Sequence, residues 1–238
     1  MEQSLILTMR PESGILWVTL NTPPLNLQSL ECMAEMEEIV SQAERDESIR
    51  ALVLTGSGDR VFCAGSDVKE FPALRSNFVE GKLRRENDVF TRLAELPFPT
   101  VAALNGSAMG GGFEMALCCD FRIMSSQAKI GLPEIFLGNF PGSGGVMRLT
   151  KLVGPARAFE LICLGRSVDA DTAIRLGLVH EAVEPEYLQR RALAMAGRLA
   201  KLPRSAAGRI KALVHSATYE TAAQSAVHGL HLDRNLLH

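Results

Sequence analysis

The residues from Gly110 to Gly145 read GGGFEMALCCDFRIMSSQAKIGLPEIFLGNFPGSGG and combine two glycine clusters with two carboxylates, Glu114 and Glu134. The first cluster follows an apolar run, 101–104, and precedes a helix-like segment, 113–119. A strand that turns through glycines into a helix aims backbone N–H groups at one point, backed by the positive end of the helix dipole. A carboxylate beside that point suits acid–base chemistry on a group that develops negative charge.

Outward from this stretch, short apolar runs alternate with segments of helical period. The predicted strands are 4–9 and 15–20 (a hairpin), 51–55, 100–104, 121–124, 128–130 and 179–183; the predicted helices are 27–43, 76–96, 113–119, 144–152, 155–164, 170–176, 185–200 and 205–217. Continuous apolar strands joined by helices predict parallel pairing and an α/β fold. We expect a core over residues 1–201 and a helical C-terminal region over 202–238, in which helical spacing continues from Glu220 to Leu237.

Composition is that of an ordinary globular protein. The chain has 238 residues, 47% of them hydrophobic, which is enough to bury a sizeable core. Its net charge of −2 provides no electrostatic reason to expect nucleic acid or an anionic membrane as a partner. The local basic cluster Lys82–Arg85 is predicted to be a solvated helix face.

The five cysteines are odd in number, lie mostly in apolar runs and form no CxxC pair, so we interpret them as reduced core residues rather than zinc ligands. The N-terminus resembles neither a secretory signal nor a transit peptide, and no apolar run approaches the ~20 residues of a membrane span. We therefore expect a cytoplasmic protein.

Nucleotide, serine-nucleophile and zinc motifs fail at specific positions. The pattern GxGxxG would need a small residue at Met115 or Val61, and GxxxxGK[ST] is absent. No serine stands in GxSxG, and HExxH fails at Glu184. What remains is a second small-residue turn, 62–67 (FCAGSD), after the strand 51–55. N–H groups from two such turns can polarise one carbonyl oxygen, and each donor contributes ~3–4 kcal/mol to transition-state stabilisation.

At these residues the chain resembles the enoyl-CoA hydratase/isomerase (crotonase) superfamily. The matching segments, in the expected order, are PPLN (23–26), ALVLTG (51–56), FCAGSDVKEF (62–71), LPFPTVAALNGSAMGGGFEMALCCDFRI (96–123), KIGLPEIFLGNFPGSGGVMRLTKLVG (129–154) and AIRLGLV (173–179). The resemblance implies a crotonase-like spiral of ββα turns with a helical C-terminal region used for trimer contacts. It also implies an acyl-CoA thioester substrate and a homotrimer or dimer of trimers.

The resemblance assigns roles to particular residues. The backbone N–H groups of Ser66 and Gly111 would form the oxyanion hole, and Glu114 and Glu134 would be the catalytic pair. The CoA and thioester site would be lined by Ala64, Gly65, Asp67, Val68, Lys69 and Gly110. No metal or redox cofactor is expected, since coenzyme A is part of the substrate.

The implied reaction is syn hydration of a trans-2-enoyl-CoA, with Glu114 as the base toward water and Glu134 as the acid toward C2. Paired carboxylates suit this task because mutual repulsion separates their pKa values. One carboxylate could instead move a proton between C2 and C4, as in a Δ3,Δ2-enoyl-CoA isomerase. A third possibility is an acyl-CoA-binding protein with little turnover. Relatives usually continue past this chain's end with another helix and a basic tail, so the C-terminal region is expected to be incomplete.

Structural interpretations compete with these roles. Glu114 alone could be an acid that complements a helix dipole, and Pro133-Glu134 is a common helix start. Asp67 could cap the next segment, and Lys69 and Arg60 could be solvated or meet a CoA phosphate. Asp120 is expected to be structural. Two departures from the family pattern are Ser66, where alanine is common, and Leu132, where glutamine is frequent.

Overall fold

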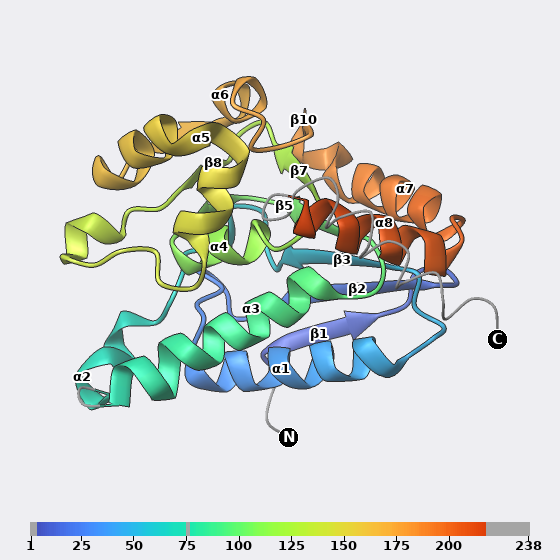
Figure 1. Cartoon of the computed structure of the whole chain (residues 1–238), viewed down its shortest axis with the longest axis horizontal. Helices are drawn as coiled ribbons and strands as arrows, with labels where there is room; N and C mark the ends of the chain where they lie inside the picture. The colour runs from blue at the N-terminus through green and yellow to red at the C-terminus, as the bar shows by residue number, and fades with distance from the viewer. Residues whose placement is uncertain (1–3, 75–76, 218–238) are drawn as a thin grey trace.

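The computed structural model describes residues 4–74 and 77–217. Two sheets lie at its centre with helices on both sides (Figure 1). The helical spacing predicted for Glu220–Leu237, and with it the end of the C-terminal region, lies outside the described residues.

The larger sheet has six strands in the order β1-β2-β3-β5-β7-β10. Their bounds are β1 Ile6–Met9, β2 Ile15–Leu20, β3 Ala51–Gly56, β5 Thr100–Leu104, β7 Phe121–Ser125 and β10 Glu181–Val183. The pair β1–β2 is antiparallel, as the predicted hairpin requires, and every other neighbouring pair is parallel. The predicted α/β class with parallel pairing is therefore confirmed.

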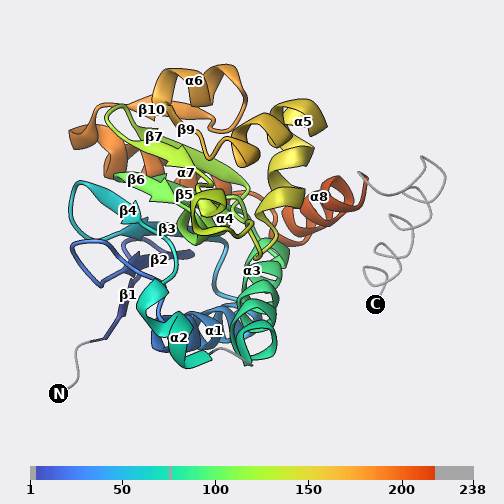
Figure 2. The same ribbon diagram turned by 90° about the vertical axis from the view of Figure 1, so that its left-hand side faces the viewer.

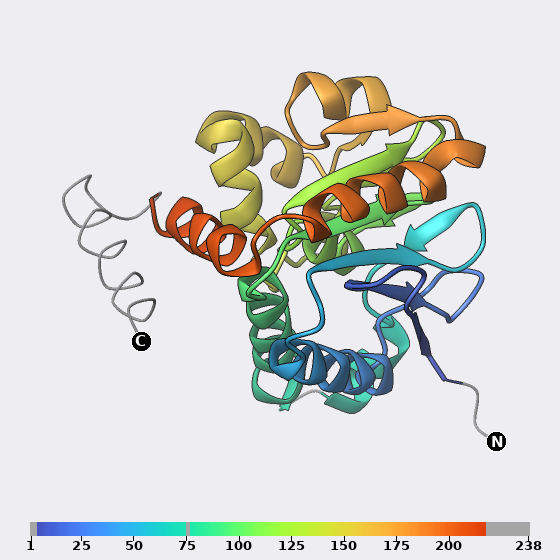
Figure 3. The ribbon, with the colours of Figure 1, turned by 90° about the vertical axis from the view of Figure 1, so that its right-hand side faces the viewer.

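The strands of this sheet are continuously apolar because both faces are covered. In β3, Leu52 and Leu54 pack into the core shared with α1 (Leu30–Arg45) and α3 (Arg85–Glu95), whereas Val53 packs into the core shared with α7 (Leu188–Ala200). Alternate side chains of a strand point to opposite faces, so neither face can be polar. Figure 3 shows α7, in orange, crossing the sheet on the side opposite α1, in blue.

The smaller sheet has four short strands in the order β4-β6-β8-β9. They are β4 Val61–Cys63, β6 Ser107–Met109, β8 Lys129–Gly131 and β9 Ser167–Asp169. Of these only β8 was predicted, since three-residue strands are too short to show a period. A short strand follows each of β3, β5 and β7, which produces the repeated ββ unit expected for a crotonase-like spiral. The strand entering the Gly110 turn is thus β6 and not the apolar run 101–104.

The remaining helical elements connect and cover these sheets. They are η1 Val68–Glu70, α2 Phe71–Leu74, η3 Val79–Arg84, α4 Gly111–Ala116, η4 Glu134–Leu137, α5 Gly145–Cys163, α6 Ala170–Arg175, η5 Pro185–Tyr187 and α8 Arg204–Ser216. Gly154, at φ 75°, interrupts α5 where two separate helices were predicted. No helix in the described part of the chain is long and apolar enough to cross a membrane.

The first C-terminal helix, α8, packs on the core. Lys211 is buried there, and its Nζ lies 2.9 Å from Asp120 Oδ2, while Asp120 Oδ2 also accepts a hydrogen bond of 2.8 Å from the Thr100 amide. Asp120 is thus structural, as expected. In Figure 2, α8 lies beside the end of α3.

The predicted helix 76–96 differs from the structure in its first half. Its residues 79–84 form η3, a wide π-helical segment, before α3 begins. The helical period predicted for 76–96 puts Val79 on the buried side of the helix, but its side chain is 61% exposed. Lys82, predicted to be part of a solvated face, is 2% exposed. The wider turn changes which side chains face the core, and a 3.6-residue period does not predict it.

Candidate active site

The two glycine turns lie side by side. Gly65 (φ 98°) follows β4, and Gly110 (φ 53°) follows β6, its parallel neighbour. A β-carbon placed on Gly65 would lie only 2.9 Å from the Met109 carbonyl oxygen and 3.3 Å from the Gly111 nitrogen. Both the positive φ angles and this close approach require glycine. The structure therefore brings together the two segments in which the oxyanion donors were predicted.

The N–H groups of Ser66 and Gly111 have no acceptor among the described residues. Gly111 opens α4, so its N–H belongs to the first turn, where helices leave donors free. Two free donors on adjacent turns can polarise an oxygen placed between them.

Gln28 connects the two turns. Its backbone N–H donates to the Gly65 carbonyl oxygen (2.9 Å), and its own carbonyl accepts from the Asp67 N–H (3.1 Å). Its buried side chain donates to the Gly111 carbonyl oxygen (3.0 Å). Gln28 was predicted to be an ordinary helix residue, but α1 begins at Leu30 and Gln28 precedes it in an extended bridge to Ser66. The sequence carries no local signal of this role, because Gln28 lies among other polar residues such as Asn26 and Ser29.

Glu114 is buried in α4, with 3% of its surface exposed. Its Oε1 accepts two hydrogen bonds of 2.8 Å, from the backbone N–H groups of Ser143 and Gly145. Glycine is required at position 145, where a β-carbon would lie 2.7 Å from that oxygen. Burial raises the pKa of Glu114 to about 7, helped by the negative charges of Glu134 and Glu86 and opposed by the two N–H groups. A carboxyl group with this pKa is suited to exchange protons near neutral pH.

Glu134 begins η4 and has a different environment. Neither of its carboxylate oxygens has a hydrogen-bond partner among the described residues, although both are buried. A β-carbon on Gly110 would lie 3.2 Å from Glu134 Oε1, so this carboxyl group lies against the first glycine turn. Burial raises its pKa. The two predicted catalytic residues thus share one region but differ in how firmly they are held.

The other residues predicted for the substrate site lie on the second turn and beyond it. Ala64 donates its N–H to the Leu25 carbonyl oxygen (2.9 Å). Asp67 caps η1 by accepting a hydrogen bond from the Lys69 N–H (3.0 Å), which is the capping role expected if Asp67 does not contact substrate. The side chains of Val68 and Lys69 are exposed, as is Arg60. The contacts of these residues with substrate stay a prediction.

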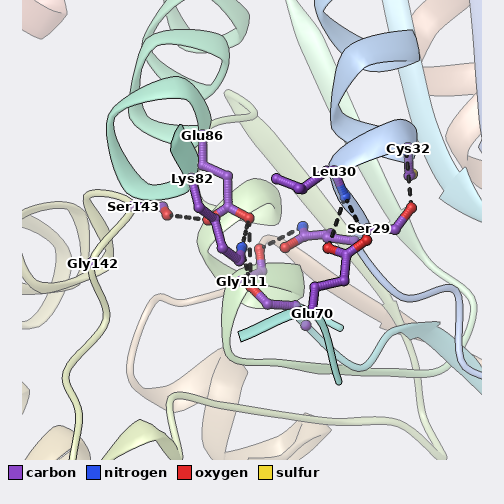
Figure 4. A network of polar contacts seen from close by, with 12 residues as sticks. Ser29, Leu30, Cys32, Glu70, Lys82, Glu86, Gly111, Gly142 and Ser143 are labelled. Carbon is purple, nitrogen blue, oxygen red and sulfur yellow. Dashed lines mark hydrogen bonds and ion pairs between the residues drawn. The ribbon is translucent and has the colours of Figure 1, made fainter. Parts of the chain in front are cut away.

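A buried polar cluster joins the site from the side of α3. Lys82 Nζ donates to Ser66 Oγ (2.9 Å) and forms an ion pair with Glu86, whose Oε2 accepts from Ser143 Oγ (2.9 Å). Figure 4 shows Lys82, Glu86 and Ser143 beside Gly111. None of these three residues was predicted to belong to the site. A lysine and a glutamate four positions apart normally indicate a solvated helix face.

The described residues include no group of three or more His, Cys, Asp or Glu side chains arranged to hold a metal ion. Four of the five cysteines are buried and Cys163 is exposed; all five are free thiols.

Comparison with known proteins places this site in a family. The enoyl-CoA hydratase/isomerase family model matches residues 10–238. A short-chain-enoyl-CoA hydratase of Clostridium acetobutylicum is 40% identical over 194 residues, which cover 80% of this chain and 74% of that protein. A crotonyl-CoA hydratase of Syntrophomonas wolfei is 37% identical over 198 residues, which cover 83% of this chain and 75% of that protein.

Solved structures agree with the sequence matches. The crystal structure of an enoyl-CoA hydratase from Bacillus anthracis superposes with a TM-score of 0.90 at 32% identity, covering 98% of this chain and 89% of the other. The chain thus combines a crotonase-like fold, two glycine turns whose N–H groups lack acceptors among the described residues, and two glutamates with raised pKa values, and its relatives include proteins named enoyl-CoA hydratases. The chain belongs to the enoyl-CoA hydratase/isomerase family of enzymes.

Proposed function

We propose that this enzyme is an enoyl-CoA hydratase, which adds water syn across the double bond of a trans-2-enoyl-CoA. The observation that carries the proposal is a pair of neighbouring glutamates. Glu114 is buried and held by two N–H groups, whereas the buried carboxylate oxygens of Glu134 have no partner among the described residues. Hydration needs one carboxyl group to orient and deprotonate water and another to deliver a proton. The names of the relatives support the same reaction class.

In this proposal the thioester oxygen accepts hydrogen bonds from the N–H groups of Ser66 and Gly111. Glu114 removes a proton from water as the water oxygen bonds to C3 of the substrate. The electron pair of the double bond moves to C2 and the thioester, and the oxyanion is stabilised by the two N–H groups. Glu134 then donates a proton to C2. Only water and protons are exchanged, so the reaction as proposed requires no redox cofactor or metal.

The direct test is the addition of crotonyl-CoA to the purified protein. We expect the absorbance of the conjugated thioester to fall. Mass spectrometry should then show a 3-hydroxyacyl-CoA product that is heavier than the substrate by one water molecule. A screen over acyl chain lengths then defines the preferred substrate. An intact protein that leaves every 2-enoyl-CoA unchanged while acting on another acyl-CoA would contradict the proposal.

The isomerase alternative has one observation in its favour: the carboxylate oxygens of Glu134 have no partner in the part of the chain that the structure describes, which leaves them free to carry a proton between C2 and C4. Glu114→Gln separates the two reactions. If isomerisation of a 3-enoyl-CoA persists in this variant, and the parent does not hydrate, the enzyme is an isomerase.

We also propose that the enzyme self-associates as a trimer. Phe136, Leu137 and Phe140, in and after η4, are exposed by 74%, 66% and 61%, and Phe159 on α5 by 71%. Such exposed aromatic and aliphatic side chains indicate an interaction surface. Sedimentation velocity should show a species of three chains that Phe159→Ser weakens; a monomer at all concentrations would exclude this assembly.

A further inference from the structure

The Lys82–Glu86 ion pair is buried more deeply than the other ion pairs of the described residues. The side chains are 2% and 4% exposed, whereas the pair with the same spacing on the same segment, Glu80–Arg84, is 59% and 68% exposed. Removing two charges from water is costly, and apolar residues of similar size commonly serve stability as well or better. Stability alone therefore does not account for charges at these positions.

The pair contacts two segments of the proposed site, the turn that carries Ser66 and the loop that carries Ser143. On one side, Lys82 Nζ donates to the hydroxyl of Ser66, whose backbone N–H is a proposed oxyanion donor. On the other side, Glu86 Oε2 accepts from the hydroxyl of Ser143, whose backbone N–H holds Glu114. The next residue of α3, Asn87, donates to the Gly142 carbonyl oxygen (2.7 Å). Two hydrogen bonds, at Gly142 and at Ser143, therefore connect α3 to this loop.

The charge of Glu86 also reaches Glu114. Like charges nearby disfavour ionisation of a buried carboxyl group, and Glu86 acts on Glu114 in this sense. Other titratable or charged groups around Glu114 come from every neighbouring element: Glu134 from η4, Lys82 from η3, Arg148 from α5 (its guanidinium donates to the Ser143 carbonyl oxygen) and Cys118 from the turn after α4.

We propose that Lys82 and Glu86 are positioning residues. They hold the turn that carries Ser66 against the loop that carries the Ser143 and Gly145 N–H groups, and they set the charge around Glu114. Neither residue is assigned a contact with substrate. The catalytic consequence rests on the proposed function, but the coupling between Glu86 and Glu114 does not.

The first test is Glu86→Gln, which keeps a hydrogen-bonding group at position 86 and removes its charge. We expect the acidic limb of kcat/KM, which reports ionisation of Glu114 in the free enzyme, to move to lower pH. The substitution changes the net charge of the ion pair from zero to +1, which favours the ionised form of Glu114. The matched control is Glu80→Gln, which removes the same charge from the exposed pair and should leave the limb in place.

The second test is the double variant Lys82→Met, Glu86→Leu, with Glu80→Leu, Arg84→Met as its control. Replacing a buried pair by apolar residues preserves folding in many proteins. We expect a melting temperature within a few degrees of the parent but a kcat at least about tenfold lower, with KM nearly unchanged. A purely structural pair predicts parental kcat in a variant that remains folded, and that result would overturn the proposal.

An infrared titration makes the outcome independent of the proposed reaction. The protonated carboxyl band that is lost in Glu114→Gln is followed against pH in the parent, in Glu86→Gln and in Glu80→Gln. A shift to lower pH in Glu86→Gln alone supports the coupling even if the parent hydrates no enoyl-CoA. Identical titrations in the three proteins would refute it.

Discussion

The site has two halves, one around Glu114 and one around Glu134. Both carry a carboxyl group, but the hydrogen bonds that hold the two groups differ. Glu114 lies in α4 and accepts two backbone hydrogen bonds from the loop before α5. Glu134, on η4, has no partner for either oxygen within the described residues. Both carboxyl groups have raised pKa values because both are buried.

Under the proposed function, this difference suits the two carboxyl groups to different roles. A carboxylate whose one oxygen is held by N–H groups has a fixed orientation and directs its other oxygen to a water molecule. A carboxyl group without partners keeps its proton more readily and is free to deliver it. Three substitutions test this difference, with an expected effect that decreases from Glu114→Gln through Glu134→Gln to Gln28→Leu.

Glu114→Gln should have the largest effect. The amide keeps the shape of the side chain but cannot accept a proton, so we expect kcat for hydration to fall about 10³–10⁴-fold with little change in KM. Steady-state kinetics with crotonyl-CoA, beside circular dichroism to check the fold, measure this. A loss smaller than that of Glu134→Gln would reverse the roles assigned to the two halves.

The same variant should alter stability in a pH-dependent way. The pKa of Glu114 rises from 4.5 to about 7 on folding, so its contribution to stability is present below pH 4.5 and is lost as pH rises through 7. Between pH 5 and pH 8 the parent should lose roughly 3 kcal/mol through this group. Glu114→Gln should lack that loss in denaturant titrations; equal pH dependence in the two proteins would show that Glu114 is not desolvated as described.

Glu134→Gln should lower kcat for hydration by about 10²-fold, less than Glu114→Gln, because a water molecule can partly replace a proton donor in an unpartnered position. The pH limb assigned to Glu114 should move to lower pH only to the extent that Glu134 is ionised in the free enzyme, since only an ionised Glu134 disfavours ionisation of Glu114. Kinetics across pH 5 to 9 provide both numbers. Parental activity at every pH would mean that Glu134 takes no part.

Gln28→Leu should have the smallest effect, about tenfold in kcat/KM. Leucine preserves volume but removes the bond to the Gly111 carbonyl oxygen, so the two turns lose one of their connections while the backbone bonds to Gly65 and Asp67 remain. Thermal unfolding serves as the control, because Gln28 Oε1 is buried and has no partner within residues 4–74 and 77–217, so its loss should not destabilise the protein. If activity and melting temperature both stay at the parental level, the side chain does not position the turns.

Much of the scaffold could be predicted because its signals are local. The strand 51–55 and the run 100–104 are continuously apolar, and helix 185–200 has a clear period, so their types were correct. The short strands around 61–63, 107–109 and 167–169 were missed, because three residues contain no period and their pairing depends on distant segments.

The candidate site was also predicted only in part, since its local features were found and its contacts between distant segments were not. Glycines that need positive φ angles and the two glutamates are visible in the sequence, and with them the resemblance to the family. Lys82 was placed on the surface because its charge and spacing are typical of solvated helix faces, whereas η3 and α3 turn it inward to Glu86 and Ser66. A partner from another segment offsets the cost of burying a charge, and a local pattern does not identify that partner.

The amino-acid sequence by itself thus determined the α/β class, the parallel scaffold, the family and the candidate acid–base pair, since each depends on residue type, spacing or local backbone preference. Tertiary structure alone decided how the two turns are joined through Gln28, which glutamate is held and which is free, and where the Lys82–Glu86 pair lies. These features depend on distances between atoms of residues far apart in the chain, and on burial, which sets the strength of every charge interaction in the site.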